Sequence, residues 1–160
     1  MKRKTALITG ASKGIGKEFA RIHALKGGDL VLVARSKDEL MLLKNELETR
    51  YKSIRVEVII KDLTESRSAI EIYEELEAKD IQVEYLINNA GFGDYGLFVD
   101  TDWDRFEQMI NLNIKTLTHL CHLFIPDMIE RKQGKIMNIS STAAFLPGPM
   151  MAVYFATKSY

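Results

Sequence analysis

Short apolar runs alternate with longer amphipathic stretches along the 160-residue chain. The run from Leu30 to Ala34 is almost continuously apolar, which is typical of a parallel strand covered on both faces. Segment 55–60 alternates and is rich in β-branched residues, which also favours a strand. The pattern predicts five strands, at residues 5–8, 30–34, 55–60, 83–87 and 135–139.

Helical periodicity fills the intervals between these strands. Residues 14–26 carry an apolar stripe at helical spacing. Ser36, followed three residues later by Glu39, fits a capping box and predicts a helix that runs to about Tyr51. The other predicted helices are one capped by Thr64, a long one over 102–131 that is interrupted near 111–113, and one that follows Pro149.

This alternation of strand and helix is the βαβ pattern of a parallel sheet with helices on both faces. Right-handed crossovers favour an α/β, doubly wound parallel sheet, in which ligands bind at the carboxyl ends of the strands. No repeat or linker divides the sequence, so we expect residues 1–160 to belong to one domain.

Composition excludes several functional classes. The 22 basic and 22 acidic side chains balance, which argues against a nucleic-acid-binding protein. No apolar run approaches the roughly 20 residues that span a membrane, and the one behind the basic N-terminus is too short for a signal peptide. Cys121 is the only cysteine, so we expect a cytoplasmic protein without disulfides. His119 and His122 beside it are too few for a metal site, and we expect no metal.

A glycine-rich loop joins the first predicted strand to the first predicted helix. It runs from Thr9 to Gly16 with the spacing Gly-x-x-x-Gly-x-Gly. Glycines let the backbone approach a pyrophosphate, and the helix N-terminus that follows offers N–H groups and a partial positive charge. A plain strand-to-helix turn is the alternative interpretation. We interpret the loop as a nucleotide site formed by Gly10, Ser12, Lys13, Gly14, Ile15 and Gly16.

The end of the second predicted strand distinguishes NAD from NADP. An acidic residue there would bind the ribose hydroxyls and repel a 2′-phosphate. The chain has Arg35 and Ser36 instead, and Arg35 can form paired, charge-assisted hydrogen bonds to a phosphate. Lys13 in the glycine loop adds a second positive charge. The sequence therefore predicts NADP(H) as the cofactor, although both cations are also compatible with a plain solvated surface.

Tyr154 and Lys158 are four residues apart, one helical turn from each other. A neighbouring ammonium ion favours the ionised form of a phenol, which makes Tyr154 a candidate general acid and base. The pattern alone is common on helix surfaces, but here it occurs together with the glycine loop. Tyr95 and Tyr160 lack such a lysine.

Together these motifs resemble the short-chain dehydrogenase/reductase family, in its single-domain Rossmann-fold branch, over essentially the whole chain. Residues 9–16 match the family's glycine motif, and Asp62 and Leu63 match the pair that contacts the adenine. Asn88-Asn89-Ala90-Gly91 matches the motif whose last three residues border the cofactor. The catalytic tetrad of the family matches Asn113, Ser141, Tyr154 and Lys158.

The resemblance implies a role for each member of this tetrad. Tyr154 exchanges the proton of the carbonyl or alcohol oxygen while the nicotinamide exchanges a hydride. Lys158 holds the nicotinamide ribose and assists the tyrosine, and Ser141 orients the carbonyl. Asn113 holds a helix distortion and a water that relays protons. Ser140 and Asn111 compete for two of these positions, and the family's spacing and sequence context favour Ser141 and Asn113.

The resemblance also implies partners. We expect a small carbonyl or alcohol substrate, and an apolar one because Phe145, Leu146, Met150 and Met151 lie where the family builds part of its substrate wall. Segment 146–149 further resembles reductases of 3-oxoacyl thioesters and of steroids. Family members commonly pair along the helices that carry the tetrad, so a homodimer or homotetramer is expected.

Two other functions remain as alternatives, a non-catalytic NADP(H)-binding regulatory protein and an epimerase or dehydratase. Regulators often lose the tyrosine or the lysine, and both are present here. The epimerases and dehydratases usually bind NAD, so Arg35 argues against them. Family members continue well past the active-site lysine. We therefore expect this chain, which ends at Tyr160, to be part of a longer parent and to lack the C-terminal strands.

Overall fold

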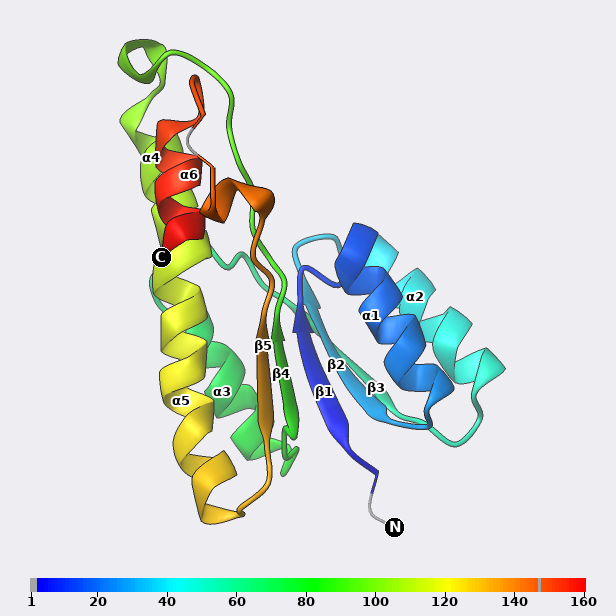
Figure 1. The fold of residues 1–160 in the computed structure, drawn as a ribbon. Coiled ribbons are helices and arrows are strands. Elements are labelled where there is room, and N and C mark those ends of the chain that lie inside the picture. The colour runs from blue at the N-terminus through cyan, green and yellow to red at the C-terminus, as the bar shows by residue number, and fades with distance from the viewer. Residues whose placement is uncertain (1–2, 147) are drawn as a thin grey trace.

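A computed structural model describes residues 3–146 and 148–160, so Pro147, in the segment before the last predicted helix, lies outside the described residues. Within these residues, five strands form one parallel sheet in the order β3-β2-β1-β4-β5 (Figure 1). They are β1 (Thr5–Thr9), β2 (Asp29–Ala34), β3 (Val56–Ile60), β4 (Tyr85–Asn88) and β5 (Lys135–Asn138). Each matches a predicted strand with small differences at the ends.

Helices cover both faces of the sheet (Figure 1). One face carries α1 (Gly14–Leu25) and α2 (Lys37–Arg50), and the other carries α3 (Ser68–Ala78) and α5 (Leu117–Glu130). Beyond the carboxyl ends of the strands, α4 (Trp103–Ile110) and α6 (Ala152–Ser159) pack together. The remaining helical segments are a π-helix between α4 and α5 (Asn111–Thr116) and two 3-10 helices (Phe98–Asp100 and Thr142–Ala144). The predicted doubly wound α/β fold is confirmed.

Alternating side chains along β1 explain why the sheet has a core on each face. Ala6 and Ile8 pack in the layer under α1 and α2, whereas Leu7 packs in the layer under α3 and α5. All three are fully buried. Because such a strand needs an apolar residue at every position, the continuous apolar runs of the sequence are found in the centre of the sheet.

The caps of two helices differ from the prediction, although α2 begins directly after Ser36 as expected. Ser36 is the residue before α2, but its side chain makes no capping hydrogen bond, so the predicted capping box is wrong. Thr64 does not cap α3, which begins after Arg67. The backbone N–H and the hydroxyl of Thr64 instead donate to the same carboxylate oxygen of Asp62, at 2.9 and 2.8 Å. That turn at the end of β3 satisfies the polar groups that a helix cap would have used.

The strand order reverses between the neighbouring strands β1 and β4, and side chains join the ends of these two strands. The buried Thr9 hydroxyl accepts hydrogen bonds from the backbone N–H groups of Asn89 and Ala90, both at 3.0 Å. The Asn89 amide donates back to the carbonyl of Thr9 at 2.9 Å. Ligands of doubly wound sheets bind where the strand order reverses, and these bonds fix that point.

Replacing Thr9 with Val should therefore cost stability although the side-chain shape is kept. The change leaves two backbone N–H groups without their acceptor, and we expect a loss of about 1–3 kcal/mol in the free energy of unfolding, measured by urea denaturation. Thr142→Val, at an exposed position, is the matched control and should stay within about 0.5 kcal/mol of the wild type. Equal stability of the two variants would contradict this account.

Candidate active site

A broad, open cleft runs along the carboxyl ends of the strands. Apart from Gly16, every residue that we predicted to bind the cofactor lines it. These lining residues are Gly10, Ser12, Lys13, Gly14, Ile15, Arg35, Ser36, Asp62, Leu63, Asn89, Ala90, Gly91, Tyr154 and Lys158. Segments from four strand ends and from α6 are thus brought together in one place.

Glycines shape the floor of this cleft. Gly10 and Gly14 have φ angles of +64° and +53°, a backbone conformation that other residues rarely adopt. Gly16 is buried behind the loop, where a Cβ atom would overlap the carbonyl oxygen of Gly10 and the amide of Asn89. Its role is to let α1 approach β1 closely, which explains why it does not line the cleft.

The N-terminus of α1 faces the same cleft through residues 12–15. Its first turn contains no acidic residue, and the Lys13 side chain makes no capping bond. The free N–H groups and the positive end of the helix dipole therefore stay available for an anion. This arrangement suits the pyrophosphate of a dinucleotide.

Arg35 and Lys13 lie at the end of the cleft where the sequence predicts a 2′-phosphate. Both side chains are about three-quarters exposed, and each pairs with a carboxylate: Arg35 with Asp62 at 3.6 Å, and Lys13 with Glu39 at 2.9 Å. Burial opposes ionisation of Asp62, but hydrogen bonds from Thr64 and the charge of Arg35 keep the pKa of Asp62 below its usual value. Asp62 is thus an anion that can accept hydrogen bonds from a ligand.

Tyr154 and Lys158 project from α6 into the other end of the cleft. The Lys158 ammonium donates to the carbonyl of Ile139 at 3.1 Å, and burial lowers the pKa of Lys158 below its ordinary 10.5. Lys61 and Arg105, which also line the cleft, pair with carboxylates as Lys13 and Arg35 do. Within the described residues, no ion pair involves Lys158, so its charge faces the cleft uncompensated.

Asn113 holds this end of the site in place. It is buried in the π-helix, which confirms the predicted interruption of the long helix. Its amide nitrogen donates to the carbonyl of Phe92 at 2.9 Å and to the hydroxyl of Thr157 at 3.0 Å, and its oxygen accepts from the Phe92 N–H at 3.2 Å. Asn113 therefore ties the loop after β4 to α6, one residue before Lys158.

The two candidate serines take different positions. Ser140 lines the cleft, whereas the hydroxyl of Ser141 accepts a hydrogen bond from the Ala143 N–H at 3.1 Å and caps the short helix that follows. The sequence prediction that Ser141 is the catalytic serine stays a prediction.

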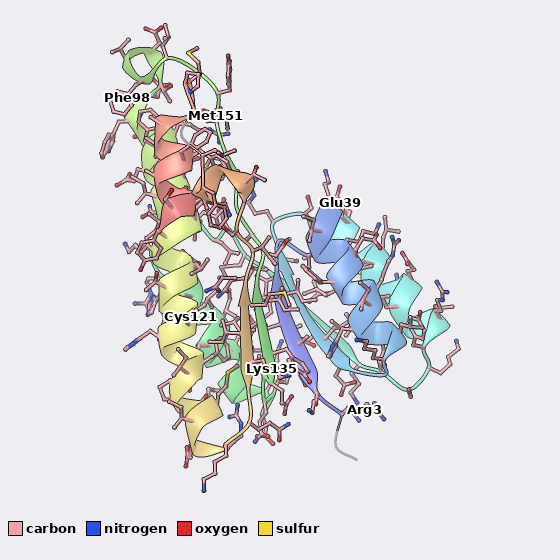
Figure 2. All side chains as sticks on the ribbon, viewed as in Figure 1. Arg3, Glu39, Phe98, Cys121, Lys135 and Met151 are labelled. Carbon is pink, nitrogen blue, oxygen red and sulfur yellow. The ribbon has the colours of Figure 1, made fainter. Side chains whose placement is uncertain are left out.

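A smaller, mostly apolar cavity is also lined by Tyr154. Met150 and Met151 line it as the sequence suggested, but Phe145 and Leu146 do not, and both are exposed. Figure 2 shows Met151 at the start of α6 and Phe98 near the adjoining helix. The rest of the apolar lining comes from Leu97, Phe98, Phe106, Met109, Ala152 and Val153.

Sequence reasoning missed three residues that support the site. Thr9 and Thr157 bind other site segments through their hydroxyls, as described above. Arg105 lies over the ring of Phe92 at 4.2 Å and pairs with Asp94 at 3.1 Å, which holds the loop after β4 against α4. The only sequence signal for the two threonines is their position next to Gly10 and Lys158.

Over residues 3–146 and 148–160, the structure contains no cluster of three or more metal-binding side chains. The same residues include no helix with the length and apolar character needed to cross a membrane.

Comparisons with known proteins agree with this geometry. A very-long-chain 3-oxoacyl-CoA reductase of Anas platyrhynchos is 34% identical over 163 residues, which cover 97% of this chain and 50% of the relative. The human inactive hydroxysteroid dehydrogenase-like protein 1 is 33% identical over 158 residues, or 97% of this chain and 47% of the relative. The chain spans about half the length of these curated relatives.

A solved structure is also similar throughout. A short-chain dehydrogenase from Sphingobium yanoikuyae in complex with NADPH superposes with a TM-score of 0.91 at 38% identity, covering 98% of this chain and 61% of that one. The model of the short chain dehydrogenase family matches residues 4–159. Since that match covers nearly the whole sequence, the chain belongs to the short-chain dehydrogenase family.

Proposed function

We propose that the protein is an NADP(H)-dependent oxidoreductase that acts on a carbonyl or alcohol substrate, with Tyr154 as general acid and base. One observation carries the proposal: Tyr154 and Lys158 line the same cleft as the glycine loop and the N-terminus of α1. The relative solved with NADPH supports the choice of cofactor.

The residues present suit a dinucleotide along the whole cleft. Arg35 and Lys13 would hold the 2′-phosphate, Asp62 the adenosine, and the N-terminus of α1 the pyrophosphate. Tyr154 and Lys158 would border the nicotinamide and its ribose at the opposite end. The cofactor supplies the hydride chemistry, and the protein supplies position and electrostatics.

Tyr154 then handles the proton. In the reductive direction its hydroxyl donates to the carbonyl oxygen as negative charge develops there, and in the oxidative direction it accepts that proton. We expect the Lys158 ammonium, which forms no ion pair within the described residues, to stabilise the negative charge that develops on the phenol oxygen as its proton leaves. Ser141, or Ser140 in its place, would donate a hydrogen bond that orients the carbonyl.

The apolar cavity beside Tyr154 favours an apolar substrate. The similarity to a very-long-chain 3-oxoacyl-CoA reductase makes 3-oxoacyl thioesters a narrower candidate class, with steroids beside them. We further propose a cytoplasmic homodimer or homotetramer. The relative named inactive keeps a non-catalytic NADP(H)-binding protein as the second candidate function. The presence of both Tyr154 and Lys158 favours the enzyme.

Replacing Tyr154 with Phe should reduce turnover by about 10²- to 10⁴-fold, because the proton donor is lost. The affinity for NADPH should change little, since the ring and the lysine remain. NADPH oxidation with apolar ketones and a 3-oxoacyl thioester, together with NADPH fluorescence titration, checks both statements. Tyr160→Phe, at an exposed tyrosine two residues after Lys158, is the control. Undiminished turnover by Tyr154→Phe would refute the assignment, and a wild type that binds NADPH without turnover favours the regulatory function.

Gly93 seats the catalytic ring. A Cβ atom on Gly93 would lie 2.9 Å from Cδ2 and 3.0 Å from Cγ of Tyr154. Gly93→Ala should therefore displace the phenol and lower kcat about tenfold or more at unchanged NADPH affinity. A Cβ atom on Gly96, in the same loop, would contact only Thr101 Oγ1, at 3.4 Å. Gly96→Ala should therefore keep most of the activity. Similar kcat values for the two variants would show that Gly93 does not set the ring position.

Lys158→Met should abolish efficient turnover without lowering the melting temperature near neutral pH. Because burial lowers the pKa of Lys158, the unfolded chain binds this proton more tightly than the folded one. The protonated lysine therefore lowers the free energy of unfolding of the wild type. This destabilisation is fully present at pH values below the lowered pKa and disappears as the pH rises toward 10.5. Thermal unfolding at about pH 7 and pH 10 should therefore show the variant's relative stability falling with pH. If the stability of the variant relative to the wild type rises with pH, the pKa of Lys158 is not lowered in the folded protein.

A further inference from the structure

Glu39 lies in the first turn of α2, beside the start of α1, where Figure 2 labels it. One carboxylate oxygen pairs with the Lys13 ammonium at 2.9 Å, while the other, Oε2, is buried without a hydrogen-bond partner. The hydrogen bond and charge of Lys13 lower the pKa of Glu39, so the side chain is an anion at neutral pH. A predicted capping residue is thus a negative charge that pairs with a cation of the cofactor cleft.

The other two cations at this end of the cleft are also neutralised, each by a carboxylate that has further partners. Asp62, which pairs with Arg35, accepts two hydrogen bonds from Thr64. Glu71, which pairs with Lys61, also lies 3.5 Å from Arg67. Both carboxylates therefore keep a stabilising contact when their cation turns toward a ligand.

Besides Lys13, Glu39 has only the neutral side chains of Ser36 and Ser12 as hydrogen-bond partners in the part of the chain that the structure describes. Among the described residues, Lys13 is the one cation within ion-pair distance of Glu39, and Oε2 is already unpaired. When Lys13 moves to a phosphate, Glu39 loses its counter-ion and faces a second anion nearby. Both effects oppose binding of a 2′-phosphate and leave a dinucleotide without that phosphate unaffected.

We propose that Glu39 is a specificity-determining residue that competes with the cofactor's 2′-phosphate for Lys13 and so narrows the preference for NADP(H) over NAD(H). This inference rests on the proposed function, since it takes the Lys13 end of the cleft as the 2′-phosphate site. The ion pair between Lys13 and Glu39 neutralises both charges when no cofactor is bound. Breaking this pair costs free energy, and only a cofactor with a 2′-phosphate requires it to break.

The test compares the dissociation constants of Glu39→Gln and the wild type. We expect Glu39→Gln to bind NADPH about three- to tenfold more tightly, with NADH affinity unchanged and the gain reduced at high salt. Glu46→Gln is the matched control, because Glu46 pairs with Arg21 at 2.8 Å between α1 and α2, and Arg21, unlike Lys13, does not line the cleft. It should alter neither affinity.

Several outcomes would overturn the proposal. They are an unchanged or weaker NADPH affinity of Glu39→Gln, an equal gain for NADH, or a gain that persists in the Lys13→Met background. Weaker NADPH binding would mean that Glu39 orients Lys13 for the phosphate rather than competing for it.

A pair of fragments separates this proposal from the proposed catalytic function. Adenosine 2′,5′-bisphosphate and adenosine 5′-monophosphate probe the adenosine end without the nicotinamide, and calorimetry gives their affinities. Glu39→Gln should raise the affinity for the bisphosphate and leave the affinity for the monophosphate unchanged, even if no carbonyl compound is turned over. If the wild type does not favour the bisphosphate over the monophosphate, both the 2′-phosphate site and the role of Glu39 are wrong.

Discussion

The cofactor cleft depends on how closely the backbones of β1, α1 and β4 approach one another. At Gly16 any side chain would overlap the carbonyl of Gly10, and a Cβ atom on Gly10 would itself lie 3.0 Å from the Cα of Ala90. The Thr9 hydroxyl and the Asn89 amide hold the strand ends at that spacing. Because the strand order reverses here, the close approach leaves an opening above it, where the N-terminus of α1 can meet an anion.

The same contact region also positions the chemical end of the site. The loop that leaves β4 at Gly91 is held from both sides by Asn113, whose amide continues to Thr157 on α6. The π-helix is what brings Asn113 to this loop, because it displaces the side chain from regular α-helical register. Tyr154 and Lys158 thus take their places from a network anchored at the carboxyl edge of the sheet.

Local patterns could be predicted from the sequence, whereas contacts between distant segments could not. Apolar runs predicted the strands, and the spacing of Tyr154 and Lys158 marked the pair that we propose to be reactive, because both lie on one helix face. Thr157 acts through Asn113, which is 44 residues away, so no local pattern reveals it. Glu39 was misread as a capping residue for the same reason, since its partner is a lysine of the glycine loop on another element. The choice between the two serines likewise needs the position of a substrate.

The most direct test of the account is a crystal structure of the protein grown with NADPH. The account predicts the 2′-phosphate against Arg35 and Lys13, the pyrophosphate at the N-terminus of α1, and the nicotinamide between Tyr154 and the loop that follows Gly91. A dinucleotide bound elsewhere, or bound here with its nicotinamide away from Tyr154, would contradict the central claim that the glycine loop and the Tyr154–Lys158 pair form one site.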